Sequence, residues 1–413
     1  MNVLSKRVRH GVRAAATSRR RVGAVPAAVV ASTAVLVAAS PSQAQQSPGS
    51  HMGGAVDPSQ HRPMDMTVTS QSGGDASAKS QMQMSGMRMN PAPAGVLAGQ
   101  MPPSGGLVLS YSALRIVNGK LLSGTNTISP EEAVLTVPNP NQPPVQLRRV
   151  PMSNTVLVQG FAVNYGVTPW LSVGAATTYL NKSTDTVTFA GTSGIRRLGT
   201  SQDSTNGLGD SRIGVQVRLW RNETNVVHVA FGVGLPTGSI TQIIHPLQPN
   251  GQTGTSRAGY TLQLGTGTFD ALPAVTWLGQ YGDVGMGAAY RGRMSMQGRN
   301  AEGYRWGNVN LLTAWVSYRF MPLLSGSFRV QGLAAGAISG RDPKITGPGL
   351  GANPANIGGD RIDAFVGMQL ANLPAGIGAG GINLELGVPL YQKANGAHLG
   401  GTWSLQLSGT LRF

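Results

Sequence analysis

The chain has 413 residues, of which 58 are glycine and 26 are proline, and only 12% are charged. Glycine and proline disfavour the interior of a helix, and the charged share is about half of that usual in soluble proteins, so the composition excludes a helical bundle and a charge-rich disordered chain. The absence of cysteine excludes disulfides, thiolate metal sites and cysteine nucleophiles. The composition suits a β structure that has one wall in an apolar solvent and small polar residues on the other.

The first 44 residues have the pattern of a secretory signal peptide. A basic region, residues 1–21, holds seven Lys and Arg residues and no acid, and an apolar stretch follows over 22–39. The triplet 42–44 offers small residues at the two positions that a signal peptidase reads, so we expect cleavage after Ala44. The alternative is an uncleaved membrane anchor, which Pro26 opposes. Without the leader the net charge falls from +16 to +9, and the remaining basic residues are scattered, so no nucleic-acid partner is expected.

Residues 45–105 show neither a helical nor a strand period and are rich in Ser, Gln, Gly and Met, which predicts a disordered periplasmic tail. Several methionines form Met-x-Met pairs, and thioether sulfur is a soft ligand for Cu(I) or Ag(I). The alternative is a low-complexity tether with incidental methionine; no other cofactor is indicated. The candidate metal ligands are His51, His61, Met64, Met66, Met82, Met84, Met87 and Met89.

Runs of about ten residues that alternate between apolar and polar recur from residue 106 onward, as in transmembrane β-strands. The alternation is visible over 211–220, 283–293 and 379–390. It is clearest in the final run. There Trp403, Leu405, Leu407, Leu411 and Phe413 share one face, and Ser404, Gln406, Ser408, Thr410 and Arg412 share the other.

The connections between the predicted strands alternate strictly between short and long. We expect strands at 106–117, 154–165, 170–180, 211–220, 225–235, 268–279, 283–294, 308–320, 325–337, 360–371, 379–390 and 401–413. The pattern of tight turns and long loops predicts an all-β, transmembrane, antiparallel up-and-down β-barrel of about 12 strands over 106–413, in the outer membrane and with its turns in the periplasm. The expected partners are outer-membrane lipid, lipopolysaccharide and, because the last strand ends on Phe413, the barrel assembly machinery.

Six segments carry recognisable motifs: Ser204-Thr-Asn-Gly-Leu-Gly-Asp210, Leu235-Pro-Thr-Gly-Ser239, Gln263-Leu-Gly-Thr-Gly-Thr-Phe-Asp270, Gly303-Tyr-Arg305, Leu312-Thr-Ala-Trp315 and Gly387-Val-Pro-Leu-Tyr391. They resemble those of a known family of outer-membrane proteins, the "transporter" family named for the MetA pathway of phenol degradation. The resemblance covers residues 100–413 and implies a barrel that carries small, aromatic compounds, without catalytic or ligand residues to transfer. The first strand, however, reads Leu-Val-Leu-Ser-Tyr at 107–111, without the histidine and methionine motifs of some relatives, which opposes a metal role.

Alternation also identifies which charged side chains face the barrel interior. Arginine on the lipid side would cost about 2–4 kcal/mol at mid-membrane, so inward placement is expected. A lumen rich in arginine favours anionic or polar solutes, because charges at a constriction set selectivity. The alternative is a set of wall residues tied to one another and to water. The candidates are Arg218, His228, Arg291, Arg319, Arg329, Asp363, Glu385 and Arg412.

Catalysis is not expected. An inward His228 could act as a base for a serine nucleophile, but no serine motif accompanies it. The preferred function is therefore an outer-membrane channel for small solutes, aromatic or anionic, and the alternative is soft-metal binding and tolerance through the tail.

Overall fold

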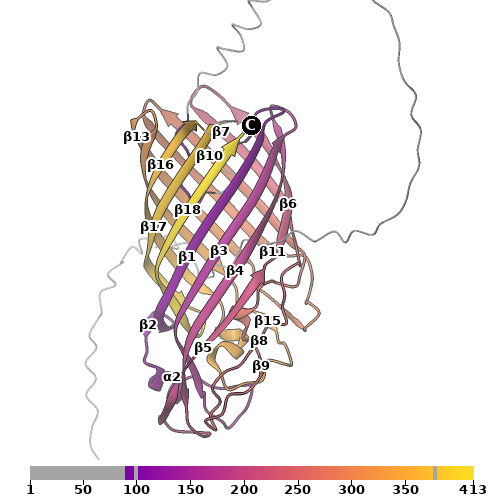
Figure 1. Ribbon diagram of the computed structural model, residues 1–413, viewed down its shortest axis with the longest axis vertical. Helices are drawn as coiled ribbons and strands as arrows, with labels where there is room; N and C mark the ends of the chain where they lie inside the picture. The colour runs from indigo at the N-terminus through magenta and orange to yellow at the C-terminus, as the bar shows by residue number, and fades with distance from the viewer. Residues whose placement is uncertain (1–88, 97–100, 375–378) are drawn as a thin grey trace, which may run out of the picture.

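The structure, a computed structural model, describes residues 89–96, 101–374 and 379–413 (Figure 1). Twelve antiparallel strands form one closed barrel, because the last strand pairs with the first. The predicted fold class is confirmed, and every predicted strand is present. The barrel strands are β1 (Leu107–Ser123), β3 (Arg149–Gly166), β4 (Leu171–Phe189), β6 (Ser211–Arg221), β7 (Asn225–Leu235), β10 (Asp270–Tyr281), β11 (Val284–Ser295), β13 (Val309–Met321), β14 (Leu324–Ala335), β16 (Gly359–Pro374), β17 (Ala379–Ala394) and β18 (Ala397–Arg412).

The wall has an apolar outer face and a polar inner face, as alternation predicts. On β18, Leu405, Leu407 and Leu411 are 39–43% exposed on the outside, whereas Ser408 on the inside is 7% exposed. Leu219 on β6 and Val366 on β16 are more than 60% exposed in the same way. Large apolar side chains that face outward around a closed sheet are what a lipid environment requires. None of the helices in the described residues is long and apolar enough to cross a membrane.

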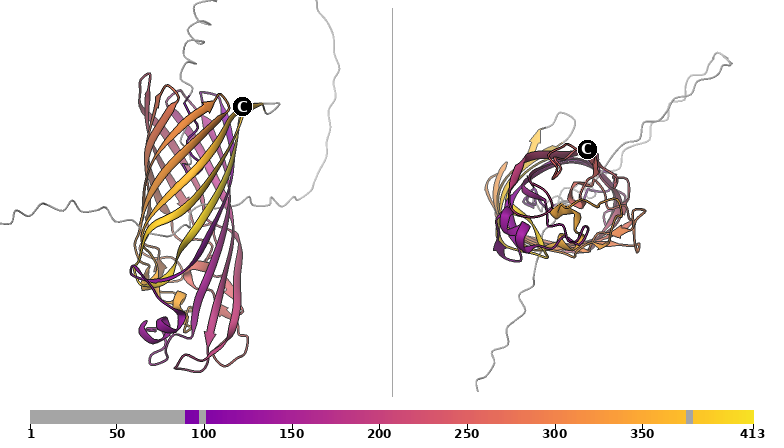
Figure 2. Two further views of the ribbon diagram at one scale, coloured as in Figure 1. Left: turned by 90° about the vertical axis from the view of Figure 1, so that its left-hand side faces the viewer. Right: turned by 90° about the horizontal axis from the view of Figure 1, so that it is seen from below.

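The long connections all lie at one end of the barrel, at the bottom of Figure 1, and short turns lie at the other. The connection between β17 and β18 at the end of the long connections is a turn of two residues, 395–396, where the sequence predicts a loop over 391–400, because both strands extend further than predicted. We call the long connections, 124–148, 190–210, 236–269, 296–308 and 336–358, the cap. Viewed along the barrel axis from the cap end, segments of the cap lie across the opening (Figure 2). The cap contains β2 (Asn126–Thr127), α2 (Pro130–Thr136), β5 (Arg197–Leu208), β8 (Ile243–Ile244), β9 (Ser256–Arg257), η1 (Tyr260–Leu262), β12 (Tyr304–Arg305), β15 (Ser339–Gly340), η2 (Leu350–Ala352) and η3 (Pro354–Asn356).

The strand β5 lies where the sequence predicts a loop. It pairs with the far half of β4, from Tyr179 opposite Leu208 to Phe189 opposite Arg197, so β4 extends well past its predicted end at residue 180. The last four residues of this extension, 186–189, read Thr-Val-Thr-Phe, and all three residue types favour strands. The hairpin therefore projects beyond the closed barrel into the cap.

Two apolar clusters hold the cap together. In the first, Ala133 and Val134 of α2 pack with Leu147, Phe189 and Leu350, all of which are at most 1% exposed. The helix α2 can begin at Pro130 because the hydroxyl of Ser129 accepts a hydrogen bond from the backbone N–H of Glu132 at 3.0 Å. The second cluster joins the long loops to one another and contains Tyr260, Tyr304, Trp306, Ile338, Ile345, Ala352 and Ile357.

Candidate functional site

Residues 89–96, which we call the inner segment, lie inside the barrel and contact its inner wall. The backbone N–H of Asn90 donates to Oε1 of Gln280 on β10 at 2.8 Å. Nε2 of Gln406 on β18 donates to the carbonyl of Ala94 at 3.0 Å. The strands β10 and β18 are on different sides of the barrel, so the segment spans the lumen. The tail assigned from the sequence to the periplasm thus has at least this part in the lumen.

The inner segment ends at a buried ion pair. Nε of Arg329 on β14 lies 2.9 Å from Oε1 of Glu385 on β17, and both side chains are at most 1% exposed. The second carboxylate oxygen, Oε2, accepts a hydrogen bond from the backbone N–H of Gly95. The guanidinium of Arg329 also donates to Gln331 at 2.8 Å and lies 3.7 Å from the ring centre of Phe365. Each buried charge is therefore partnered, as burial requires.

An apolar contact complements these polar ones. Val96 is 5% exposed and packs against Leu278, Ala289 and Trp315, which face inward from β10, β11 and β13. Met89 packs on the same cluster. Burying a valine side chain contributes about 1.5–3 kcal/mol, so this contact stabilises the segment as much as its hydrogen bonds do.

A cavity of about 620 Å³ opens at the turn end of the barrel, next to the inner segment. Its wall includes one carboxylate, Asp283, whose Oδ1 lies 3.7 Å from Nη1 of Arg319. The positive side chains exceed the negative ones, so the mouth of the lumen is positively charged. A smaller cavity of about 190 Å³ lies between the inner segment and the inner faces of β18, β1 and β3. The basic residues that line the larger cavity are Arg218, Arg221, His228, Arg319 and Arg412.

At the cap end the loop 236–269 fills the lumen. Leu264 is 3% exposed and packs against Ile116, Val158 and Leu180 on the inner face of the wall. Nζ of Lys182 on β4 donates to the carbonyl oxygens of Thr261, at 3.0 Å, and Gln263. These contacts hold the loop 236–269 against the inner face of the wall at the cap end.

Three motifs that carry the sequence resemblance meet at the base of this loop. The carboxylate of Asp210, in Gly-Leu-Gly-Asp, accepts a hydrogen bond from the backbone N–H of Gly238 at 3.0 Å. It accepts a second one from the backbone N–H of Thr266 at 2.7 Å. Gly238 belongs to Leu-Pro-Thr-Gly-Ser and Thr266 to the segment that precedes β10. The motifs are therefore structural here, because together they fasten the loop 236–269 to β6.

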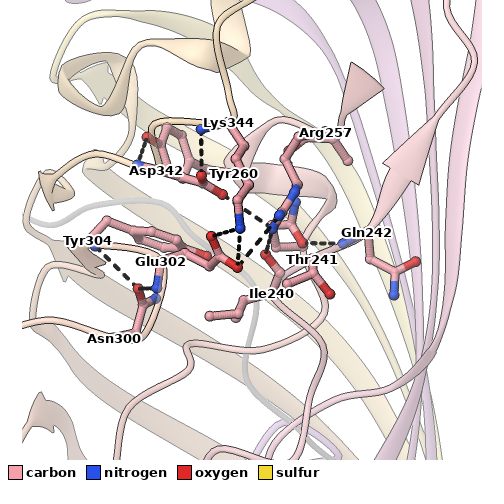
Figure 3. A network of polar contacts seen from close by, with 12 residues as sticks. Ile240, Thr241, Gln242, Arg257, Tyr260, Asn300, Glu302, Tyr304, Asp342 and Lys344 are labelled. Atoms are coloured by element: carbon pink, nitrogen blue, oxygen red, sulfur yellow. Dashed lines mark hydrogen bonds and ion pairs between the residues drawn. The ribbon is translucent and has the colours of Figure 1, made fainter. Parts of the chain in front are cut away.

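An ion-pair network joins three cap loops (Figure 3). The carboxylate of Glu302 lies 3.0 Å from Nζ of Lys344 and 3.5 Å from Nη2 of Arg257. Nη1 of Arg257 lies 3.4 Å from Oδ2 of Asp342, whose backbone N–H donates to Oη of Tyr260 at 3.0 Å. The hydrogen bond from Lys344 is the main cause that holds the pKa of Glu302 below its ordinary value. Burial raises the pKa of Tyr260.

The structure places the predicted lumen residues on the inner side of the wall. Glu385 forms an ion pair with Arg329, and alternation predicts an inward side chain at both positions. Asp363, 3% exposed, pairs with Arg361 at 2.7 Å, and His228, 2% exposed, stands opposite Arg218 in the strand register. Arg291 alternates with inward-facing Ala289 on β11. Of the candidate metal ligands only Met89 is described, and His51, His61, Met64, Met66, Met82, Met84 and Met87 lie outside the described residues, so soft-metal binding stays a prediction.

Sequence reasoning missed several charged groups of the lumen and the cap. Arg361 and Arg293 have the same strand parity as Asp363 and Arg291, so alternation contained the signal for them. Arg293 is 4% exposed and lies 3.2 Å from Asp270. No periodicity marks the inner segment, whose sequence at 91–95 reads Pro-Ala-Pro-Ala-Gly, and none marks the cap network.

No family model matches the chain, and no curated protein does. Among solved structures, 91 chains match. An outer membrane channel from Pseudomonas putida F1 matches with 11% identity and a TM-score of 0.49, over 77% of this chain and 99% of that one. The Pseudomonas putida toluene transporter TodX matches with 8% identity and a TM-score of 0.37 over 75% and 91%, and the Ralstonia pickettii toluene transporter TbuX with 12% and 0.37 over 75% and 90%. None of these TM-scores reaches 0.5, so the barrel fold rests on its own strand pairing.

Proposed function

We propose that this protein is an outer-membrane channel for small solutes that favours anions and that the inner segment closes. The observation that carries the proposal is the positively charged cavity of about 620 Å³ that leads from the turn end to the inner segment. Charged rings that line a pore set its selectivity, and arginine selects anions. The export pattern of residues 1–44 and the resemblance of residues 100–413 to a transporter family support the same function.

The proposed orientation follows from the connections. Outer-membrane barrels have short periplasmic turns and longer external loops, so the cap faces outside and the charged cavity faces the periplasm. A solute that enters from outside passes the cap, then the inner segment, and leaves through the cavity. The apolar cluster around Val96 and Trp315 would contact the apolar body of an organic anion, such as an aromatic acid, on this route.

Conductance of the full-length protein in planar lipid bilayers tests the selectivity. Under a salt gradient we expect the reversal potential to report anion preference. Replacing both Arg218 and Arg412 with glutamine removes two of the positive side chains at the mouth and should move the reversal potential toward zero. The control is Arg196→Gln, which makes the same charge change on the exposed surface of the cap and should leave the potential unchanged.

Cation preference in the parent protein would contradict the proposal. So would an anion preference that the double substitution leaves intact. A silent barrel that stays silent when the inner segment is displaced by the Gly95 variant described below would exclude a channel altogether.

A further inference from the structure

One arginine lies on the outer, lipid-facing side of the wall. Arg115 on β1 is exposed, whereas the next residue, Ile116, is 4% exposed and faces the lumen. Its cross-strand neighbours are Leu157 on β3 and Leu405 on β18, which are both apolar. Within the described part of the chain, no carboxylate forms an ion pair with Arg115. Such a charge in a lipid-facing wall calls for a partner outside the protein.

The depth of Arg115 in the wall follows from strand geometry. The backbone of Leu107 at the turn end exchanges hydrogen bonds with that of Phe413, at 3.1 and 2.9 Å, so this residue marks the periplasmic rim. Arg115 follows Leu107 by eight residues on the same strand. At a rise of about 3.3 Å per residue and a strand tilt of about 40°, Arg115 lies roughly 20 Å above that rim. The apolar band of such barrels is about 25 Å tall, so Arg115 lies near its outer border.

Trp403 lies beside Arg115 at this border. The guanidinium carbon of Arg115 lies 5.7 Å from the centre of the Trp403 ring, which is within the range of a cation–π contact. Aromatic residues form girdles at both borders of the apolar band, so Trp403 independently indicates an interfacial depth. The ring also fixes the direction of the guanidinium while leaving its N–H donors available for an anion.

Below this pair, toward the middle of the membrane, the outer wall is apolar. Leu405 and Leu407 of β18 are 39% and 43% exposed. Tyr111 and Phe161 continue the surface, with their ring centres 5.2 Å apart. A lipid whose headgroup contacts Arg115 would therefore lay its acyl chain against these side chains.

We propose that Arg115 and Trp403 bind a phosphate group of lipopolysaccharide in the outer leaflet. The inference rests on the outer-membrane orientation proposed above, which puts this border of the wall in that leaflet. Arginine is the preferred partner for phosphate, because its planar group donates two parallel hydrogen bonds. The phosphorylated lipid A moiety supplies both the anion at this depth and the acyl chains below it.

Native mass spectrometry of the full-length protein in detergent tests the site, with bisphosphorylated lipid A as the titrant. We expect Arg115→Gln to weaken lipid A binding about 10- to 100-fold, the factor that corresponds to one charged hydrogen-bonded contact. Arg196→Gln removes a positive charge from the exposed cap and should bind lipid A as the parent protein does. Dephosphorylated lipid A should bind the parent protein and Arg115→Gln equally and weakly.

Two outcomes would overturn the site. One is equal affinity of the parent protein and Arg115→Gln for bisphosphorylated lipid A. The other is equally tight binding of phosphatidylglycerol, which would mean that Arg115 recognises any lipid phosphate. Because no solute passage is measured, a protein that conducts nothing would still report on the site. Fractionation of cells separately tests the outer-membrane location, so the two failures are distinguishable.

Discussion

Two elements lie across the lumen, the cap (Figure 2) and the inner segment, and they are held in different ways. The cap consists of long connections that pack into two apolar clusters, in which Leu350 and Tyr260 are at most 1% exposed, and that share an ion-pair network. The inner segment has only eight residues, among which Val96 and Ala94 have buried apolar side chains, with Met89 and Ala92 partly buried. The rest of its attachment consists of hydrogen bonds to the wall residues Gln280, Asp283, Ser317, Glu385 and Gln406. Elements with few buried apolar contacts open at the lowest free-energy cost. If the proposed channel opens, the comparison favours the inner segment over the cap as the part that moves.

We expect the largest effect from removing the carboxylate of Glu385, which contacts both Arg329 of the wall and Gly95 of the inner segment. Glu385→Gln leaves Arg329 buried without a counter-charge, which costs about 3–5 kcal/mol of folding free energy. We expect the unfolding transition of the barrel, followed by heat-dependent gel migration, to shift to lower denaturant concentration. Glu223→Gln in an exposed turn is the matched control. An unchanged transition would mean that the pair contributes nothing to stability.

A second substitution is expected to destabilise the cap without destabilising the barrel. Leu350→Ala removes a side chain that is 1% exposed in the first apolar cluster, and such changes cost about 2–5 kcal/mol. Because Leu350 itself lies in a cap connection and not in a barrel strand, we expect faster proteolysis within 336–358 while the barrel transition stays in place. Leu135→Ala, at an exposed position of α2, should leave the cleavage rate unchanged. Equal loss of barrel stability would show that the cap and the barrel unfold as one unit.

The inner segment can be displaced by a substitution within it that leaves every wall residue unchanged. A Cβ at Gly95 would lie 2.2 Å from Nη2 of Arg329, which is buried and paired, so Gly95→Val should disfavour the seated segment by about 1–3 kcal/mol. We expect a higher open probability in single-channel recordings and an unchanged barrel transition. The control is Gly298→Val in the cap, because nothing lies within 4 Å of a Cβ there. A conductance equal to that of the parent protein would exclude the segment as the gate.

The smallest expected effect is the pH dependence of the cap network. The pKa of Glu302 is lowered from its ordinary value of 4.5, chiefly by the hydrogen bond from Lys344 and further by Arg257. Its stabilisation is therefore complete above pH 4.5 and is lost as pH falls through the lowered pKa. We expect loops 296–308 and 336–358 to lose protection from an acid-active protease below that pH, by less than about 1 kcal/mol. In Glu302→Gln this part of the pH dependence should disappear.

Alternation made most of the barrel strands predictable from the sequence. The structures of the cap and of the inner segment were not predictable in this way. Leu405 and Ser408 could be assigned to opposite faces because a closed sheet in lipid imposes a period of two on every strand. The same rule placed Glu385 and Arg329 on the inner face. Their pairing was not predictable, because Arg329 on β14 and Glu385 on β17 are separated by β16 and meet only across its inner face.

Other contacts depend on long-range packing that leaves no local pattern. Lys182 donates to carbonyl oxygens in a loop about eighty positions away, and a backbone carbonyl carries no sequence signal. Gly95 lies in a stretch of sequence without hydrophobic periodicity. Its position in the lumen is fixed by its backbone N–H, which donates a hydrogen bond to Glu385. The polar stretch that forms β5 reads as a loop because its strand partner is the unpredicted extension of β4.

The pairing of β18 with β1 also has a consequence for how the molecule is made. Val108 stands opposite Arg412, so the two strands that complete the cylinder come from opposite ends of the barrel sequence. Contacts between residues so distant in sequence form slowly, because the entropy of closing the loop is lost before the contact is gained. Until the last strand is synthesised, β1 presents an unpaired edge that could join another chain. The edge of β1 therefore stays exposed for longer than any other edge of the sheet, until β18 pairs with it.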